Sequence, residues 1–204
     1  MSLLSHCMPG RSLLKCGNED WKVMTGISGS MGDIYIFKGR PYMVDETGRT
    51  VTVEPDSSVQ LMDESLVVGG NMKFLVESEG DLLLADVYEC VGVRFSDHDP
   101  VRIDFFKLDE KEKKWVKLTS LGDTVVLFLG MAGSFSISAS DLCVSKGNCV
   151  IFMNNIFELE PFLNMDPVSF VLDLDEGQLT RLSDSPEYSR KIKYSDGQNP
   201  SLNQ

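Results

Sequence analysis

Short apolar runs with a period of two, separated by turns rich in Asp, Glu and Gly, recur along this chain of 204 residues. Residues 101–129 show the pattern best. Val101, Ile103 and Phe105 alternate with polar residues there, which is typical of a β-strand with one buried face. The pattern resumes after the charged residues 109–114, and we therefore predict that this segment is the exposed tip of a β-hairpin.

The charged segment 109–114 also admits a second interpretation, a helix over residues 109–118. Strand periodicity on both flanks favours the hairpin. The segment mixes acidic and basic side chains, and the chain carries a formal net charge of -12, which opposes binding to phosphate backbones. The chain is therefore expected to bind no nucleic acid, whereas a protein partner is compatible with its charge.

The same pattern predicts strands in the rest of the chain. Those outside the stretch above span residues 33–37, 40–44, 49–54, 72–77, 81–88, 134–138, 148–153, 169–174 and 178–182. A short helix is expected only at 155–162. Repeated short antiparallel strands indicate an all-β fold, which is a propeller, a sandwich or a barrel.

The two ends of the chain differ from this pattern. Residues 1–20 lack periodicity and contain Pro9, Gly10 and Gly17, so we expect a flexible arm or the remnant of a strand whose partners are missing. Residues 183–204 are polar and rich in Pro and Ser, which predicts a disordered tail.

A weak internal repeat accompanies the strands. The stretches MVDETGRTVTV, FKLDEKEKKWVKL and VLDLDEGQLTRL each combine a strand, an acidic turn and a returning strand. Their turns are marked by Asp45, Asp109 and Asp175, at spacings of 64 and 66 residues. Stacked antiparallel sheets produce such near-constant spacing, although Asp and Gly are common in any hairpin loop.

Nothing in the sequence assembles a catalytic, cofactor-binding or metal-binding site. His98 stands between Asp97 and Asp99, as a base or a metal ligand could. A turn histidine is favoured, because no soft ligands lie at local spacing. The glycine-rich stretch 26–32 matches neither GxGxxG nor a P-loop. We therefore expect no enzyme activity, no cofactor and no metal.

Cysteine usage indicates a reduced, intracellular setting, since the five cysteines are scattered and form no Cys-x-x-Cys motif. Cys143 and Cys149 are interpreted as small buried hydrophobic residues. The longest apolar stretch, near 125–129, is far shorter than the roughly 18 residues that span a bilayer, so no membrane partner is expected. Aromatic residues fall mostly in strand runs, where their ordinary role is core packing.

Five segments, in order, carry a family resemblance. They read IFKGRPYMVDETGRTVTVEP, LVESEGDLLLADVYE, FKLDEKEKKWVKLTSLGDTVVLFLG, SFSIS and SKGNCVIFMNN. Together they resemble the plant F-box-associated β-propeller family of KIB-type and SKIP-like F-box proteins. The resemblance covers residues 21–182 and implies a partial β-propeller of three to four antiparallel blades, since a four-stranded blade takes about 40 to 50 residues.

In such proteins an N-terminal F-box binds a Skp-type adaptor of a ubiquitin ligase, and the propeller selects the protein to be ubiquitinated. The resemblance therefore implies a non-catalytic protein-interaction module in the cytoplasm or the nucleus, and it carries over no catalytic residues. The sequence before Trp21 lacks the amphipathic helices of an F-box. Binding to a Skp-type adaptor is thus not expected, and a truncated gene product is suspected.

Two other functions stay open. Carboxylates gathered from distant blades could serve a glycoside hydrolase, although the sequence indicates no particular pair. A ring with too few blades leaves unpaired strand edges, so the chain could also be a fragment with no independent function.

Overall fold

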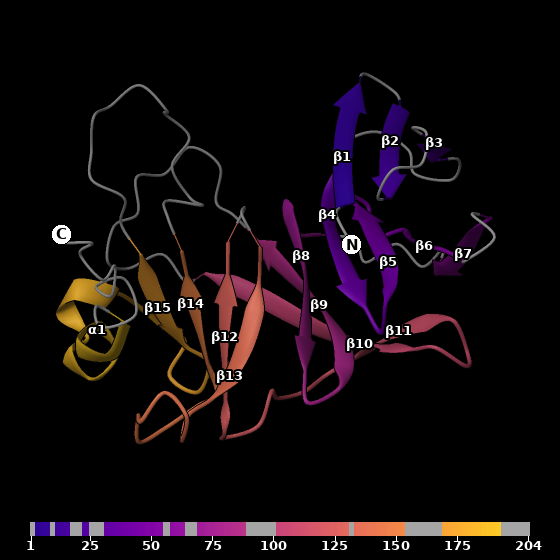
Figure 1. The fold of residues 1–204 in the computed structure, drawn as a ribbon. Coiled ribbons are helices and arrows are strands. Elements are labelled where there is room, and N and C mark those ends of the chain that lie inside the picture. The colour runs from indigo at the N-terminus through magenta and orange to yellow at the C-terminus, as the bar shows by residue number, and fades with distance from the viewer. Residues whose placement is uncertain are drawn as a thin grey trace, which may run out of the picture. The chain divides into compact units, whose positions relative to one another are not determined.

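Figure 1 shows the computed structural model of the chain. It describes the backbone of residues 3–8, 11–16, 22–24, 31–54, 58–63, 69–88, 101–130, 133–153 and 169–192, with side chains from residue 32 onward. The chain divides into two compact units. Unit 1 comprises Met1–Val91 and Arg102–Thr119, and unit 2 comprises Gly92–Val101 and Ser120–Gln204.

The described residues of unit 1 form three antiparallel sheets. Sheet 1 consists of β1 (Leu3–Met8), β2 (Arg11–Cys16) and β3 (Lys22–Met24). Sheet 2 consists of β4 (Met31–Phe37), β5 (Arg40–Asp45), β6 (Thr50–Val53) and β7 (Val59–Asp63), in that order. Sheet 3 consists of β8 (Met72–Ser78), β9 (Asp81–Tyr88), β10 (Arg102–Asp109) and β11 (Lys114–Lys117), also in that order. Sheets 2 and 3 are thus four-stranded meanders, like the blades of a propeller.

The predicted hairpin at residues 101–118 is confirmed, and a helix there is excluded. β10 pairs with β11 in a register that places Asp109 opposite Lys114. The carboxylate of Asp109 shapes the turn, because it accepts hydrogen bonds from the backbone N–H groups of Lys111 and Glu112, both at 3.0 Å.

The other strands predicted within the described residues are confirmed as well, with shifts of one or two residues at their ends. The prediction missed β3, which has three residues, and also β7. This strand has only five residues and follows the sequence EPDSS, whose turn signal hid it. The helix expected at 155–162 lies outside the described residues.

Two-residue turns close the hairpins β4–β5 and β8–β9. Lys38 and Gly39 have φ angles of 49° and 77°, and Glu79 and Gly80 have φ angles of 52° and 82°. Positive φ at both positions is characteristic of a type I′ turn, whose twist matches that of the flanking strands. The short sequences Lys-Gly and Glu-Gly therefore fix the register of both hairpins.

Sheets 2 and 3 pack face to face over a shared hydrophobic core. Its buried members are Phe37, Tyr42, Val44, Met62, Leu75, Leu82, Leu84, Leu108 and Trp115. The strands of the two sheets are aligned in the same order, so that β4 contacts β8 and β7 contacts β11. Burying one large apolar side chain contributes about 1.5–3 kcal/mol, so this core is a main source of stability for unit 1.

Two carboxylates of sheet 2 bind the edges of sheet 3. β8 and β11 are its edge strands, and such strands carry backbone N–H groups without a ladder partner. The N–H of Leu75 donates to Asp33 Oδ2 at 2.8 Å. The N–H of Trp115 donates to Asp63 Oδ2 at 2.5 Å, and its indole Nε1 donates to Thr50 Oγ1 at 2.8 Å. We call Asp33 and Asp63 the edge-capping carboxylates.

The described residues of unit 2 form one sheet, sheet 4. Its strands lie in the order β13 (Phe135–Ser138), β12 (Val125–Leu129), β14 (Cys149–Phe152), β15 (Phe170–Asp173) and β16 (Gln178–Arg181). β12 and β14 are parallel, whereas the other neighbours are antiparallel. The chain between β12 and β14 includes β13 and is long enough for the crossover that a parallel pair requires.

Two helical segments follow β16, namely η1 (Leu182–Asp184) and α1 (Pro186–Ile192). They correct the prediction of a disordered tail. Tyr188 is buried and packs, with Leu182 and Ile192, against the apolar face of sheet 4. The polar composition of this segment predicts disorder, but Tyr188 and Ile192 are four residues apart and therefore share one apolar helix face. Residues 193–204 lie outside the described residues.

Within the part of the chain that the structure describes, no helix has the length and hydropathy to cross a membrane.

β1 and β2 occupy the segment 1–20, where the sequence predicts a flexible arm or a strand remnant. They pair along their full length. Pro9 and Gly10, which suggested flexibility, lie outside the described residues. The domain boundaries at 21 and 182 stay a prediction.

The acidic repeat also needs correction. Asp173, and not Asp175, caps the third turn, because its carboxylate accepts hydrogen bonds from the N–H groups of Asp175 and Glu176 at 2.8 and 3.0 Å. Asp45 ends the second strand of sheet 2, whereas Asp109 ends the third strand of sheet 3. In a true repeat, equivalent residues would end the same strand of each blade. The near-constant spacing therefore reflects common turn chemistry and not a structural repeat.

The edge-capping carboxylate Asp33 predicts a pH-dependent stability. Burial raises the pKa of this carboxyl group from 3.8 to about 6, although hydrogen bonds from the N–H groups of Leu75 and Ile34 act to lower it. The folded state therefore binds a proton more tightly than the unfolded state. Its contribution to the free energy of unfolding falls as the pH rises from about 4 to about 6, by at most roughly 3 kcal/mol.

Asp33→Asn removes this titration. The stability of the wild type relative to the variant is expected to increase as the pH is lowered from neutral to about 4. Urea unfolding followed by the fluorescence of Trp115, which lies in the shared core, measures this difference. A relative stability of Asp33→Asn that stays constant with pH would contradict the prediction.

Candidate interaction surface

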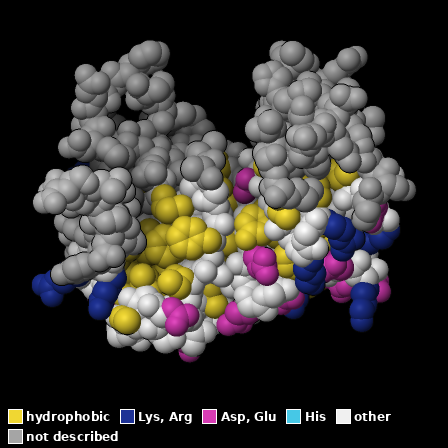
Figure 2. Space-filling view, in the orientation of Figure 1, with side chains coloured by type: hydrophobic (Ala, Val, Ile, Leu, Met, Phe, Trp, Pro, Cys, Tyr) yellow, Lys and Arg dark blue, Asp and Glu magenta, His cyan; other side chains and the backbone are white. Residues whose placement is uncertain are grey.

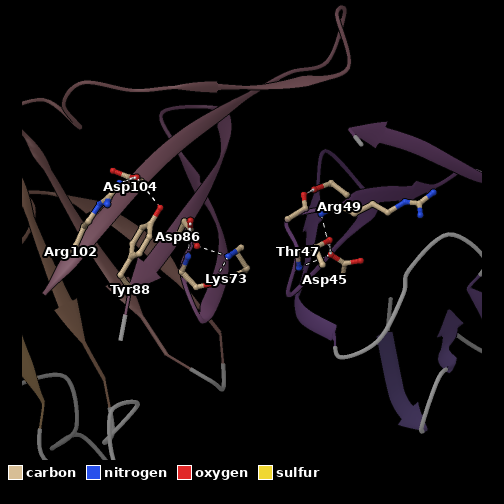
Figure 3. Close-up of polar contacts among 11 residues, drawn as sticks. Asp45, Thr47, Arg49, Lys73, Asp86, Tyr88, Arg102 and Asp104 are labelled. Carbon is tan, nitrogen blue, oxygen red and sulfur yellow. Dashed lines mark hydrogen bonds and ion pairs between the residues drawn. The ribbon is translucent and has the colours of Figure 1, made fainter. Parts of the chain in front are cut away.

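Charged side chains and one tyrosine form a row across sheet 3, on the face that meets sheet 2. The row consists of Lys73, Asp86, Tyr88, Arg102, Asp104 and Lys117, and we call it the ionic row. The strand register builds it, since Lys73 lies opposite Asp86 and Asp86 lies opposite Asp104. Tyr88 lies opposite Arg102 in the same ladder. Figure 3 shows five of these residues, from β8, β9 and β10, lying next to one another: Lys73, Asp86, Tyr88, Arg102 and Asp104.

The inner end of the ionic row is fully buried. Lys73 Nζ lies 2.5 Å from Asp86 Oδ1, and both side chains have 0% exposure. Gly70 completes the pair, because its carbonyl accepts from Lys73 Nζ at 2.7 Å and its N–H donates to Asp86 Oδ2 at 3.3 Å. A Cβ at position 70 would lie 2.1 Å from Asp86 Oδ1, so only glycine fits there. A buried ion pair of this kind is tolerated because both charges are hydrogen-bonded.

The outer end of the ionic row is open to solvent. The guanidinium of Arg102 stacks on the ring of Tyr88 at 4.2 Å from its centroid. Arg102 Nη2 lies 2.9 Å from Asp104 Oδ2, and Lys117 Nζ lies 2.9 Å from Asp104 Oδ1. The Tyr88 hydroxyl donates to Asp104 Oδ2 at 3.2 Å. Side-chain exposure is 62% for Arg102 and 56% for Lys117, against 14% for Asp104.

Electrostatics keep this outer end charged. Partial burial acts to raise the pKa of Asp104, but hydrogen bonds from Lys117 and Arg102 outweigh it and hold that pKa below its usual value. The hydrogen bond to Asp104 raises the pKa of Arg102. Asp104 is therefore ionised at neutral pH and holds two cations on one carboxylate. The three side chains carry a net charge of one positive unit at the surface.

The chemistry of the ionic row suits binding. A glycoside hydrolase needs one protonated and one ionised carboxyl group facing the substrate. Asp86 is sealed in a buried ion pair, and Asp104 is occupied by two cations. Neither carboxylate is placed to transfer a proton. Within the described residues, no group of three His, Cys, Asp or Glu side chains could hold a metal ion.

A second charged cluster joins the hairpin tips of sheets 2 and 3. Glu110 accepts from Lys38 Nζ at 2.7 Å and from Arg40 Nη2 at 3.1 Å, and Arg40 also reaches Glu54 at 3.3 Å. These groups are exposed or partly exposed to solvent, which screens their charges, so the pairs add little to stability. The cluster orients the β4–β5 and β10–β11 turns and leaves little unneutralised charge.

Unit 2 contains a polar cluster of its own around Lys146. The Lys146 Nζ lies 3.2 Å from Asp173 Oδ2 and 2.8 Å from Asp175 Oδ2. The hydroxyl of Tyr188 donates to the Lys146 carbonyl at 3.2 Å, and the thiol of Cys149 donates to that hydroxyl at 3.4 Å. Burial raises the pKa of Cys149, which keeps it a thiol. The cluster therefore anchors α1 and offers no nucleophile.

The two units present different surfaces in Figure 2. Hydrophobic side chains gather over the part that contains β12 and β13, whereas Lys, Arg, Asp and Glu side chains intermingle over the part that contains β10 and β11. Phe135 is 47% exposed and stacks on Phe128, with centroids 4.6 Å apart. It is an exception to the expectation that strand aromatics serve the core.

The structure describes only some of the candidate site residues identified in the sequence. Asp97, His98 and Asp99 lie outside the described residues, and no catalytic role is derived for them. Cys149 is buried, as predicted, but Cys143 is exposed. The structure corrects the prediction for Cys143, because this residue sits in a turn at φ 56° and not in a strand.

Sequence reasoning did not find the ionic row. The signal was present as RID in β10 and as DVY in β9, two strands whose polar residues interrupt apolar runs. The partners come from four strands, so only the register across sheet 3 reveals that these side chains meet.

Residues 1–181 match the family profile described as KIB1-4 beta-propeller. The chain belongs to this family, which confirms the resemblance found in the sequence and the all-β propeller fold.

Several relatives from Arabidopsis thaliana are similar to the chain. F-box protein SKIP23 is 30% identical over 208 residues, which cover 92% of this chain and 50% of SKIP23. F-box protein At2g17036 is 31% identical over 196 residues, which cover 88% of this chain and 48% of that protein. Putative F-box/kelch-repeat protein At5g24040 is 28% identical over 172 residues, which cover 79% and 44%. The chain spans about half the length of the curated relatives it matches.

Because Lys73 and Asp86 form a buried ion pair, we expect that substitutions of the two residues do not have additive effects on the free energy of unfolding. Lys73→Met leaves Asp86 buried without its cation and should lower the free energy of unfolding by about 3–5 kcal/mol. The double variant Lys73→Met/Asp86→Leu replaces the ion pair with apolar side chains and should lose less than about half of that. Urea unfolding followed by Trp115 fluorescence tests both variants.

Lys117→Met serves as the control for this pair. It removes an exposed cation of the same row and should cost under about 1 kcal/mol. A double variant that loses as much stability as Lys73→Met alone would contradict the account of the buried pair.

Proposed function

We propose that this chain is a non-catalytic protein-interaction module that binds the target protein of a plant F-box ubiquitin-ligase subunit. The family match over residues 1–181 carries the proposal. Its support comes from relatives that are named F-box proteins. In such a protein the F-box contacts a Skp-type adaptor, and the propeller contacts the protein to be ubiquitinated.

The described surface supports a binding role. Tyr and Arg are the side chains that most often dominate protein–protein interfaces, and Tyr88 and Arg102 are held together at the outer end of the ionic row. Asp86 and Asp104 are both engaged by cations, which favours binding over carboxylate catalysis. Adaptor binding is expected of an F-box and not of the propeller. We place the protein in the cytoplasm or the nucleus.

Proximity labelling in plant cells tests the proposed function. The chain fused to a biotin ligase should label a reproducible set of proteins, and at least one of them should bind the purified chain directly. Lys73→Met, which is expected to destabilise unit 1, should label that set more weakly. Free biotin ligase controls for background. Labelling no different from that of the free ligase would contradict the proposal, as would turnover of a glycoside by the purified chain.

A further inference from the structure

We propose that the outer end of the ionic row, formed by Tyr88, Arg102 and Lys117, is a docking site for a single carboxylate side chain, Asp or Glu, of the protein partner. The inference rests on the proposed function and names the chemistry of the partner and the residues that recognise it.

The geometry of Arg102 fits a carboxylate. A guanidinium carries five N–H donors in a planar fork that matches the two oxygens of a carboxylate. Arg102 directs Nη2 to Asp104, and its side chain is 62% exposed. The face of the guanidinium rests on Tyr88 at 4.2 Å, so its plane is fixed before a partner arrives. A donor that is already oriented loses less side-chain entropy on binding.

Lys117 supplies the second cation. Its Nζ lies 2.9 Å from the same carboxylate that holds Arg102, so Asp104 keeps the two cations within reach of one bound group. Lys117 is 56% exposed and stands on β11, the edge strand of sheet 3.

The charge balance favours a carboxylate over a phosphate. Arg102, Lys117 and Asp104 together leave one net positive charge, which a single carboxylate neutralises. A phosphate group carries about −1.5 to −2 at neutral pH and would remain uncompensated beside Asp104. The whole chain carries a net charge of -12, so an acidic segment gains nothing from its overall field. Its binding must come from short-range contacts with these side chains.

A labelled oligo-glutamate peptide tests the inference by fluorescence anisotropy with the purified chain. We expect saturable binding to the wild type. Arg102→Ala/Lys117→Ala should raise the Kd at least about tenfold, because it removes two charge-assisted contacts. Tyr88→Leu, which leaves the net charge unchanged, should also raise the Kd because Arg102 loses its support. Thermal melting of each variant checks that unit 1 stays folded.

The matched control is Lys111→Ala/Lys114→Ala. It removes the same charge from exposed positions of the same β10–β11 hairpin and should change the Kd by less than about twofold. An equal loss of binding in both double variants would overturn the inference, since it would show unspecific attraction. Tighter binding of a phosphoserine peptide or of oligo-lysine would overturn it too, as would the absence of saturable binding.

The two proposals fail separately. If the proximity-labelled partners still bind the purified Arg102→Ala/Lys117→Ala variant as tightly as the wild type, the docking site is wrong and the interaction function stands. If oligo-glutamate binds as expected but no cellular protein is labelled, the proposed function is wrong.

Discussion

Backbone N–H groups at the edges of sheet 3 must find acceptors when sheet 2 covers them, and this requirement governs the architecture of unit 1. Asp33 and Asp63 meet it at the first and last strands of the two sheets, through Leu75 and Trp115. The caps hold β4 against β8 and β7 against β11, and the hydrophobic core fills the space between them. Apolar burial supplies the larger free energy, whereas the two carboxylates set the alignment in which it is gained.

The ionic row depends on that alignment. Lys73 and Asp86 lie on the face of sheet 3 that meets sheet 2, where their charges are tolerated only as a hydrogen-bonded pair. On the next strand, β10, Asp104 pairs with the exposed cations Arg102 and Lys117, and Tyr88 orients Arg102. Buried and exposed charges are therefore parts of one ladder, and a surface suited to protein binding arises directly from the strand pairing.

The sequence predicts the local elements well because their signals are local. Period-two runs and the Lys-Gly and Glu-Gly turns identify the hairpins of sheets 2 and 3, and the order of motifs identifies the family. The edge-capping carboxylates and the ionic row could not be predicted, because Asp33 and Leu75, or Asp63 and Trp115, meet only through tertiary packing. α1 was missed for a related reason, since a single buried aromatic ring anchors it among polar residues.

Amide hydrogen exchange at Leu75 and Trp115, measured by NMR, tests most directly whether the edge-capping carboxylates join the sheets. Both N–H groups should exchange slowly in the wild type, although they belong to edge strands. In Asp63→Ala, exchange at Trp115 should accelerate at least about tenfold more than exchange at Leu75, because only one cap is lost. Fast exchange of both amides in the wild type would contradict the account, and so would equal acceleration at the two sites.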